Sequence, residues 1–379
     1  MTLAINLTDE DLTPGVFPPS VTSLELHNCC PVHLTCIPNS VTKLFIAPDS
    51  KVINPGIIPS SVKSLTLLGS SESKMMMMTG TIPQSVRRIK LIDYHLDTLI
   101  KGTLPDSLDK LIIERHGVLP DNLHELLPTR LTSFRISPGR DSILFPTTTT
   151  TTMTTTMFPC KLTKLVIDQF DDVLHPTFFP KSLLHLDMAR FNLPLDEDVL
   201  PPGLTTLRMN DFKQPFDWHT HTSLVDLYLP RFDQELKPDT LPPNLITLNV
   251  RSALLIHDHA IPVSVKNLVC SYLAGYSIKV IPPNVTKLEF ECIDLPIGFI
   301  PSSVADLSIS ITNKPNINSI PTNELKTQWW KVFTMFQPGT FIIINWGNGE
   351  HSNIICRILD TSIALILSSS HNGGLLKYR

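Results

Sequence analysis

The sequence lacks the cysteine spacing that a disulfide framework or a zinc finger needs. Seven cysteines occur in 379 residues, and none belongs to a Cys-x-x-Cys pair. An odd, scattered set fits reduced thiols better than bridges or a metal site. We therefore expect free thiols and a cytoplasmic protein. The cysteines are Cys29, Cys30, Cys36, Cys160, Cys270, Cys292 and Cys356.

Long apolar runs and a strong charge imbalance are also missing. No run approaches the roughly 18 residues that span a membrane, and the first residues have neither a basic nor an apolar leader pattern. The 31 Lys and Arg residues nearly balance 35 Asp and Glu residues. We expect no membrane partner, and we expect any other partner to be recognised by a local surface. The two glycosylation sequons, at Asn6 and Asn284, are interpreted as chance matches.

Glycine is scarce and proline abundant, at 15 and 33 residues. The prolines punctuate a ten-residue phrase that occurs fourteen times: apolar, Pro, any residue, Ser or Asn, Val or Leu, two variable residues, Leu, one variable residue, apolar. Most copies are 19 to 24 residues apart, and the longest step holds a run of threonines, residues 147–156. The phrase residues are Pro18, Pro38, Pro59, Pro83, Pro105, Pro128, Pro159, Pro180, Pro201, His221, Pro242, Pro262, Pro282 and Pro301.

The end of the phrase has the period of two that is typical of a β-strand. Side chains such as Leu24 and Leu26 should point to one face, together with Val21 three residues before Leu24. Proline favours an extended entry into each strand. The sequence predicts a mainly β, leucine-rich-repeat-like solenoid of about 14 repeats, with a parallel sheet on one face and largely extended segments on the other.

The Ser or Asn of the phrase recurs in eleven of the fourteen copies. Both residues readily bond to nearby backbone groups, so we expect a polar ladder that satisfies turn amides. A row of catalytic serines is disfavoured, because no general base recurs beside them and no Gly-x-Ser-x-Gly motif occurs.

Taken together, these motifs resemble short leucine-rich repeats and, more closely, the FNIP repeat family. Phe170, Phe191, Phe212 and Phe232 each follow a strand by three residues, in strings such as FNLP that approximate the Phe-Asn-x-Pro signature. The resemblance covers roughly residues 17–310 and implies no catalytic residue. Some family members carry an F-box, for which we expect no room before Phe17.

We divide the chain into an N-terminal cap at residues 1–16, a repeat array at 17–321 with the threonine insertion, and a C-terminal capping segment of short strands at 322–379. The last segment holds Trp329, Trp330 and Trp346. It is interpreted as a cap for the apolar end of the array; the alternative is a small binding module.

Metal, cofactor and phosphate sites are not predicted. The string from His257 to His259 and the pair His219 and His221 lack further ligands at suitable spacing. His221 is expected to be a surface substitution for the phrase proline.

Residues beside each strand leucine should face outward and form the candidate partner-binding surface. The earlier repeats carry mostly cations there, opposed by Glu114 and Asp168, and the later repeats carry more acids. We expect a protein partner to bind this face and leave the oligomeric state open. The candidate residues are Lys43, Arg88, Lys90, Lys110, Arg135, Lys164, Arg208 and Tyr228.

The leading interpretation is a non-catalytic interaction scaffold or adaptor. The first alternative is a carbohydrate-active enzyme that uses Glu289, Glu291 and Asp306, which should be neighbours on adjacent strands. The second alternative is nucleic-acid binding through the basic half. It ranks below protein binding, because the basic positions have few aromatic neighbours for base stacking.

Overall fold

The computed structural model divides the chain into two compact units, Met1–Leu204 and Thr205–Arg379. Each unit is a stack of repeats, and we call one repeat a rung. The described residues are 1–6, 15–29, 36–48, 52–69, 76–115, 120, 122–137, 157–170, 172–251, 253, 255–271, 280–292, 300–311, 341–346, 353–358, 363–368 and 374–377. The threonine run, Trp329 and Trp330 lie outside them.

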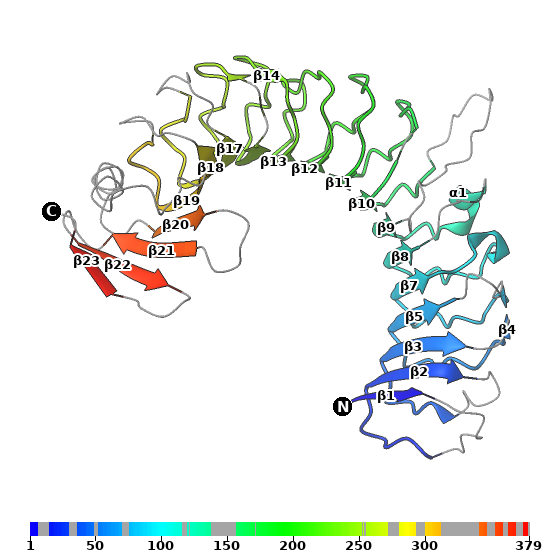
Figure 1. The fold of residues 1–379 in the computed structure, drawn as a ribbon. Coiled ribbons are helices and arrows are strands. Elements are labelled where there is room, and N and C mark those ends of the chain that lie inside the picture. Colours follow the sequence, from blue (N-terminus) through cyan, green and yellow to red (C-terminus); the bar gives the residue numbers. More distant parts are fainter. Residues whose placement is uncertain are drawn as a thin grey trace. The chain divides into compact units, whose positions relative to one another are not determined.

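In the first unit, nine strands form one parallel sheet in sequence order (Figure 1). The count refers to the described residues. The strands are β1 (Thr2–Asn6), β2 (Ser23–Cys29), β3 (Lys43–Pro48), β5 (Ser64–Leu68), β7 (Arg88–Ile92), β8 (Lys110–Glu114), β9 (Ser133–Ser137), β10 (Lys164–Ile167) and β11 (His185–Asp187).

The second unit has the same parallel pattern at first, and its last strands then pair antiparallel. Seven described strands pair in parallel, from β12 to β20, and β20 to β23 pair antiparallel. They are β12 (Thr206–Arg208), β13 (Asp226–Tyr228), β15 (Thr247–Val250), β17 (Asn267–Ser271), β18 (Lys287–Cys292), β19 (Asp306–Ile311), β20 (Phe341–Trp346), β21 (Asn353–Ile358), β22 (Ile363–Ser368) and β23 (Gly374–Lys377).

The predicted register and inward face are confirmed. Leu24 of β2 lies opposite Leu44 of β3, and Leu44 lies opposite Leu65 of β5. Among the described residues, all fourteen phrase leucines or their substitutes are buried within strands. Each buried aliphatic side chain stabilises the fold by about 1.5–3 kcal/mol relative to its exposed state, so the stack depends on this column.

A β-turn introduces each strand, and it starts at the phrase proline. The amide of Val41, for example, donates to the carbonyl oxygen of Pro38 over 3.0 Å. The equivalent bond occurs in every one of the fourteen described phrases. Proline suits the start of this turn because its φ is fixed and its missing N–H is not needed there.

The polar ladder exists, but its bonding differs from the prediction. The Ser85 hydroxyl donates to the carbonyl oxygen of Val62, and the Asn284 amide group donates to that of Val263. Both acceptors belong to the preceding rung. The ladder therefore satisfies carbonyl groups of a neighbouring turn, because the turn amides are already used by the main chain. The sequon residue Asn284 thus has a structural role.

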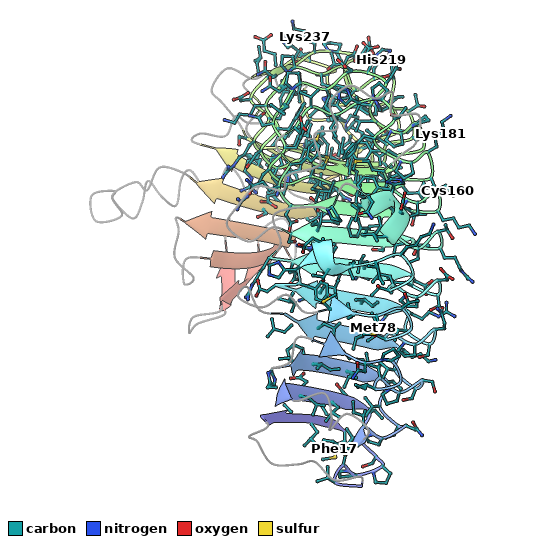
Figure 2. All side chains as sticks on the ribbon, turned by 90° about the vertical axis from the view of Figure 1, so that its right-hand side faces the viewer. Phe17, Met78, Cys160, Lys181, His219 and Lys237 are labelled. Carbon is teal, nitrogen blue, oxygen red and sulfur yellow. The ribbon has the colours of Figure 1, made fainter. Side chains whose placement is uncertain are left out.

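The side of the rungs away from the sheet is mostly extended, as predicted. The helical elements in the described ranges are α1 (Leu123–Leu126) and the 3-10 turn η2 (Leu96–Thr98). Two small parallel ladders join rungs there: β4 (Val52–Ile53) with β6 (Met76–Met77), and β14 (Glu235–Leu236) with β16 (Leu255–Ile256). The side-chain view shows turn residues such as Cys160 and Lys181 at the margin of the ribbon (Figure 2).

The four phenylalanines that suggested the FNIP signature are buried. The rings of Phe170 and Phe191 lie 6.1 Å apart, and those of Phe212 and Phe232 lie 6.5 Å apart and nearly parallel. Each pair joins consecutive rungs, so the signature residue supplies a second, aromatic column behind the leucine column.

Candidate partner-binding surface

In the first unit, the candidate cations divide into two groups by their position along the strands. Lys43, Arg88, Lys110 and Lys164 are the first residues of β3, β7, β8 and β10, and all four are exposed. The strand register aligns them with Ser64 and Ser133, the first residues of β5 and β9. We call these six positions the strand-start row.

The cations of the strand-start row have no ion-pair partner among the described residues. All four side chains are exposed to solvent. Exposed charges in such a row repel one another moderately, which a ligand of opposite charge would relieve.

Lys90 and Arg135 lie farther along their strands and are already paired. The Lys90 ammonium is 2.9 Å from a carboxylate oxygen of Glu114, and the Arg135 guanidinium is 3.0 Å from Asp168. The Ser137 hydroxyl also bonds to Asp168. These charges cancel locally, so the free positive charge of this face lies in the strand-start row.

Four apolar side chains share the outward face with these charges. Phe45, Leu68, Ile92 and Ile112 are half-buried, and Leu68 lies opposite Ile92 in the register of β5 and β7. The Phe45 ring also contacts the imidazole of His27, with centroids 4.8 Å apart. We call these four residues the outward apolar strip. The charge pattern of the sequence does not reveal this strip, but the alternation that places the charged residues outward also places these apolar residues there.

In the second unit, Arg208 and Tyr228 are register partners on β12 and β13. The guanidinium carbon of Arg208 lies 4.2 Å from the centre of the Tyr228 ring. Arg208 is exposed and Tyr228 is half-buried. This cation–π contact contributes a modest energy of about 0.5–1 kcal/mol at an exposed site.

One of the three candidate acidic residues of the second unit, Glu289, forms an ion pair that the sequence did not predict. Glu289 of β18 bonds to the Arg251 guanidinium, and Asp306 of β19 lies opposite Lys287. Glu291 lies opposite Ser310 in the register, and its side chain is outside the described set. Glycoside cleavage by two carboxylates needs one that is protonated and one that is free. Glu289 is not free in this sense, because its carboxylate is bonded to the Arg251 guanidinium.

The histidines are distributed among separate contacts. The His219 imidazole lies 3.0 Å from Asp217, and His257 lies 3.6 Å from Glu235. In the part of the chain that the structure describes, no three His, Cys, Asp or Glu side chains are grouped for a metal ion. The same part holds no helix with the length and apolar character to cross a membrane.

The prediction that His221 is a surface residue is wrong. His221 is only 7% exposed, and its ring lies 5.5 Å from that of Phe216. Phe216 in turn packs on Trp218, with ring centroids 4.3 Å apart, and Trp218 is 1% exposed. This rung replaces the phrase proline with an aromatic cluster, and the imidazole fills the proline site.

Comparison with known proteins supports the interpretation of the sequence as a repeat array. The model of the FNIP Repeat family matches residues 9–49. Among curated proteins, no sequence matches the chain. The chain thus carries FNIP repeat sequence at residues 9–49, and its rungs have the leucine-rich-repeat-like fold.

A solved structure supports the same fold. CroV588, a novel circular leucine-rich-repeat protein, is similar with a TM-score of 0.55 and 19% identity over 93% of this chain. The present chain spans 60% of CroV588. YopM from Yersinia enterocolitica matches 82% of this chain and 80% of its own at 17% identity, with a TM-score of 0.33. At these identities, the likeness to CroV588 establishes the fold alone.

Proposed function

We propose that this FNIP-repeat, leucine-rich-repeat-like chain is a non-catalytic scaffold or adaptor that binds a protein partner through the outward face of its sheet. One observation carries the proposal. The first unit presents cations that have no ion-pair partner among the described residues, in register beside half-buried apolar side chains. Stacked repeats typically use such a continuous face for protein recognition.

The composition of this face supports binding over a purely solvated sheet. A solvated face needs charge, but it has no need of Phe45 and Ile112, which lie two positions after Lys43 and Lys110 on the same strands. Apolar contacts supply binding energy when water is displaced, and charges around them supply specificity. Both elements are present within single rungs.

The enzyme alternative has weaker support. One of its candidate residues, Glu289, is bonded to Arg251. A glycosidase pair needs two carboxyl groups that face the substrate, whereas the Glu289 carboxylate is occupied by the Arg251 guanidinium. Loss of a measured glycan-cleaving activity in Glu289→Gln would favour the enzyme over the scaffold.

The experiment compares two double variants of the intact chain. The sheet variant, Phe45→Lys with Ile112→Lys, places two charges on the outward face. The matched turn variant, Ile100→Lys with Val173→Lys, makes the same kind of change at side chains that are 55% and 54% exposed away from the sheet strands. Native and variant proteins are immobilised, and proteins retained from a native lysate are quantified by mass spectrometry and then purified for direct binding.

We expect a partner that binds the native chain and the turn variant but loses affinity for the sheet variant. Circular dichroism of both variants must match the native chain. A partner that binds all three equally would move the binding site away from the sheet and contradict the proposal.

A further inference from the structure

We propose that the strand-start row binds the acidic face of an amphipathic α-helix supplied by the protein partner. This inference rests on the proposed use of the outward sheet face and adds the chemical class and secondary structure of the bound segment. It depends on the spacing of four unpaired cations, on the apolar side chains beside them, and on the neutralised state of Lys90 and Arg135.

The strand register fixes the spacing of the row. Lys43 and Arg88 are two strands apart, Arg88 and Lys110 are neighbours, and Lys110 and Lys164 are again two strands apart. Parallel strands lie about 4.8 Å apart, so the cations stand at about 0, 10, 14 and 24 Å along the stack. The row thus crosses the strands as a line about 24 Å long.

An α-helix can match all four cations with one face. Its rise is about 1.5 Å per residue, so acidic residues at positions i, i+7, i+11 and i+18 stand at about 0, 10, 16 and 27 Å. Successive residues turn by about 100°, which keeps these four within about 20° of one line. The remaining differences of a few ångströms are within the reach of lysine and arginine side chains.

An extended segment fits the row less well. At about 3.4 Å per residue, the same cations would correspond to residues 0, 3, 4 and 7. Alternate residues of a strand point to opposite faces, so two of these four acidic side chains would point away from the sheet. The uneven spacing of two, one and two strands therefore favours a helix.

The outward apolar strip accounts for the second face of the helix. Phe45 and Ile112 lie two residues beyond Lys43 and Lys110, about 7 Å along the strands, so a helix on the row can place apolar side chains over them. Three of the strip's four residues are aliphatic. Single-stranded nucleic acids are bound by a basic groove combined with aromatic rings on which the bases stack, and an aliphatic strip lacks those rings, so it suits a protein helix better.

The ion pairs beyond the row limit where an acidic segment can bind. Glu114 and Asp168 neutralise Lys90 and Arg135, so these two cations are not available to further carboxylates at that level of the strands. The acidic edge of the helix is therefore directed to the start of the strands and its apolar edge to the strip. The site therefore fixes which edge of the helix faces the strand starts, in addition to the spacing of its acidic residues.

The test uses two synthetic helical peptides of identical composition. The first carries glutamates at positions 1, 8, 12 and 19 with leucines along the adjacent edge. The second carries the same four glutamates distributed around the helix. Binding of each labelled peptide to the intact chain is measured by fluorescence anisotropy at low ionic strength, and circular dichroism checks that both peptides have equal helix content.

Two variants of the chain locate the site. The row variant changes Lys43, Arg88, Lys110 and Lys164 to serine, the residue that the row already holds at positions 64 and 133. The matched turn-charge variant removes the same net charge from exposed positions outside the sheet strands, by changing Lys101, Arg130, Lys161 and Lys181 to serine. Lys181 is labelled at the margin of the ribbon in Figure 2.

We expect the aligned peptide to bind the native chain and the turn-charge variant with similar affinity. It should bind the row variant about tenfold more weakly, as four exposed ion pairs of a few tenths of a kcal/mol each imply. The permuted peptide should bind the native chain about tenfold more weakly than the aligned one. Added salt should reduce the difference between the peptides, because the contacts are exposed.

Three outcomes would overturn the inference. Equal binding of the two peptides, or no binding of the aligned one, would exclude the helix register. An equal loss of peptide affinity in the row variant and the turn-charge variant would show that binding depends on net charge and not on the strand-start row. Row-dependent binding of a single-stranded oligonucleotide that is tighter than binding of the aligned peptide would assign the row to nucleic acid. A partner that still depends on Phe45 and Ile112 in any of these cases would leave the proposed function standing.

Discussion

The Ser40 hydroxyl donates a 2.7 Å hydrogen bond to the main-chain carbonyl oxygen of Val21, one rung earlier in the stack. The same bond recurs from Ser107 to Val86 and from Ser182 to Leu162. Each of these hydroxyls links two turns that are about 20 residues apart in sequence. The ladder therefore contributes to stacking between rungs rather than to the turn that contains the serine.

Removing one hydroxyl of the ladder should weaken the fold. We expect Ser107→Ala and Ser182→Ala each to lower the free energy of unfolding by about 1 kcal/mol, because a partly buried carbonyl loses its partner. Ser61 is the control, since its buried hydroxyl has no hydrogen-bond partner within the described part of the chain. Ser61→Ala should be neutral or slightly stabilising in urea unfolding followed by circular dichroism. Equal losses at all three positions would show that the interrung bond is not the cause.

Restoring the phrase proline at position 221 should destabilise the second unit, although every other copy of the phrase has proline there. The His221 amide donates to the Trp218 carbonyl oxygen over 3.1 Å, and its ring packs on Phe216. Proline has no N–H and cannot replace either contact. We expect His221→Pro to lower the free energy of unfolding by about 1–3 kcal/mol.

The exposed neighbour His219 provides the comparison for that variant. His219→Ala removes a solvent-exposed contact with Asp217 and should change stability by less than about 0.5 kcal/mol. Thermal unfolding followed by tryptophan fluorescence reports on the cluster, because Trp218 belongs to it. A stabilised His221→Pro protein would mean that the aromatic cluster is a tolerated substitution with no stabilising role.

The repeat period explains why so much of the fold was predictable. Leu65 and Leu67 are separated by one residue in a phrase that recurs in register, and this alone indicates which side chains are inward and which strands are neighbours. The bond between Arg251 and Glu289 could not be found in this way. These residues occupy variable positions in rungs that are 38 residues apart in sequence, and their contact depends on side-chain reach across the sheet.

His221 shows a second limit of the repeat pattern. A substitution at a phrase position can be read from the sequence, but its burial depends on neighbours that also depart from the phrase. Phe216 and Trp218 lie between two copies of the phrase, at positions where the repeat does not specify the residue type. Their rings fill the volume around His221, and only the three-dimensional packing reveals that the three changes belong together.

Two cysteines should differ sharply in reactivity. Burial raises the pKa of the Cys270 thiol to about 12, whereas Cys160 is exposed in the turn before β10. The thiolate is the reactive form, so Cys270 should resist alkylation near neutral pH. We expect iodoacetamide to label Cys160 in the folded chain and Cys270 only in urea, as measured by peptide mapping. Rapid labelling of Cys270 in the native protein would indicate that its rung opens.

The same thiol predicts a dependence of stability on pH. The pKa of Cys270 is higher in the folded chain than its ordinary value of 9.0, so the unfolded chain releases this proton first as pH rises. The contribution is complete below about pH 9 and is lost between pH 9 and about 12. Cys270→Ala removes the titration and should show a shallower alkaline loss of unfolding free energy in urea titrations. Identical slopes for both proteins would contradict the assignment.

Gly69 should be intolerant of any side chain because the next rung lies directly against it. A Cβ atom at Gly69 would clash with the main-chain oxygen of Asp93, and the Gly69 amide already donates to the Ile92 carbonyl oxygen over 2.7 Å. Backbone atoms cannot rotate away as a side chain could, so Gly69→Ala must separate two rungs. We expect a loss of about 1–3 kcal/mol in the free energy of unfolding.

Gly203 is the matched control in the same unit, since its added Cβ would meet only an ordinary contact at 3.9 Å. Gly203→Ala should change stability by less than about 0.5 kcal/mol in the same urea titration. Because the rungs near Gly69 carry Leu68 and Ile92, Gly69→Ala should also weaken any partner that packs on the outward apolar strip. A stable Gly69→Ala protein with native affinity would contradict this prediction. It would mean that β5 and β7 can separate without loss of stability, so that the two rungs are not closely packed at this point.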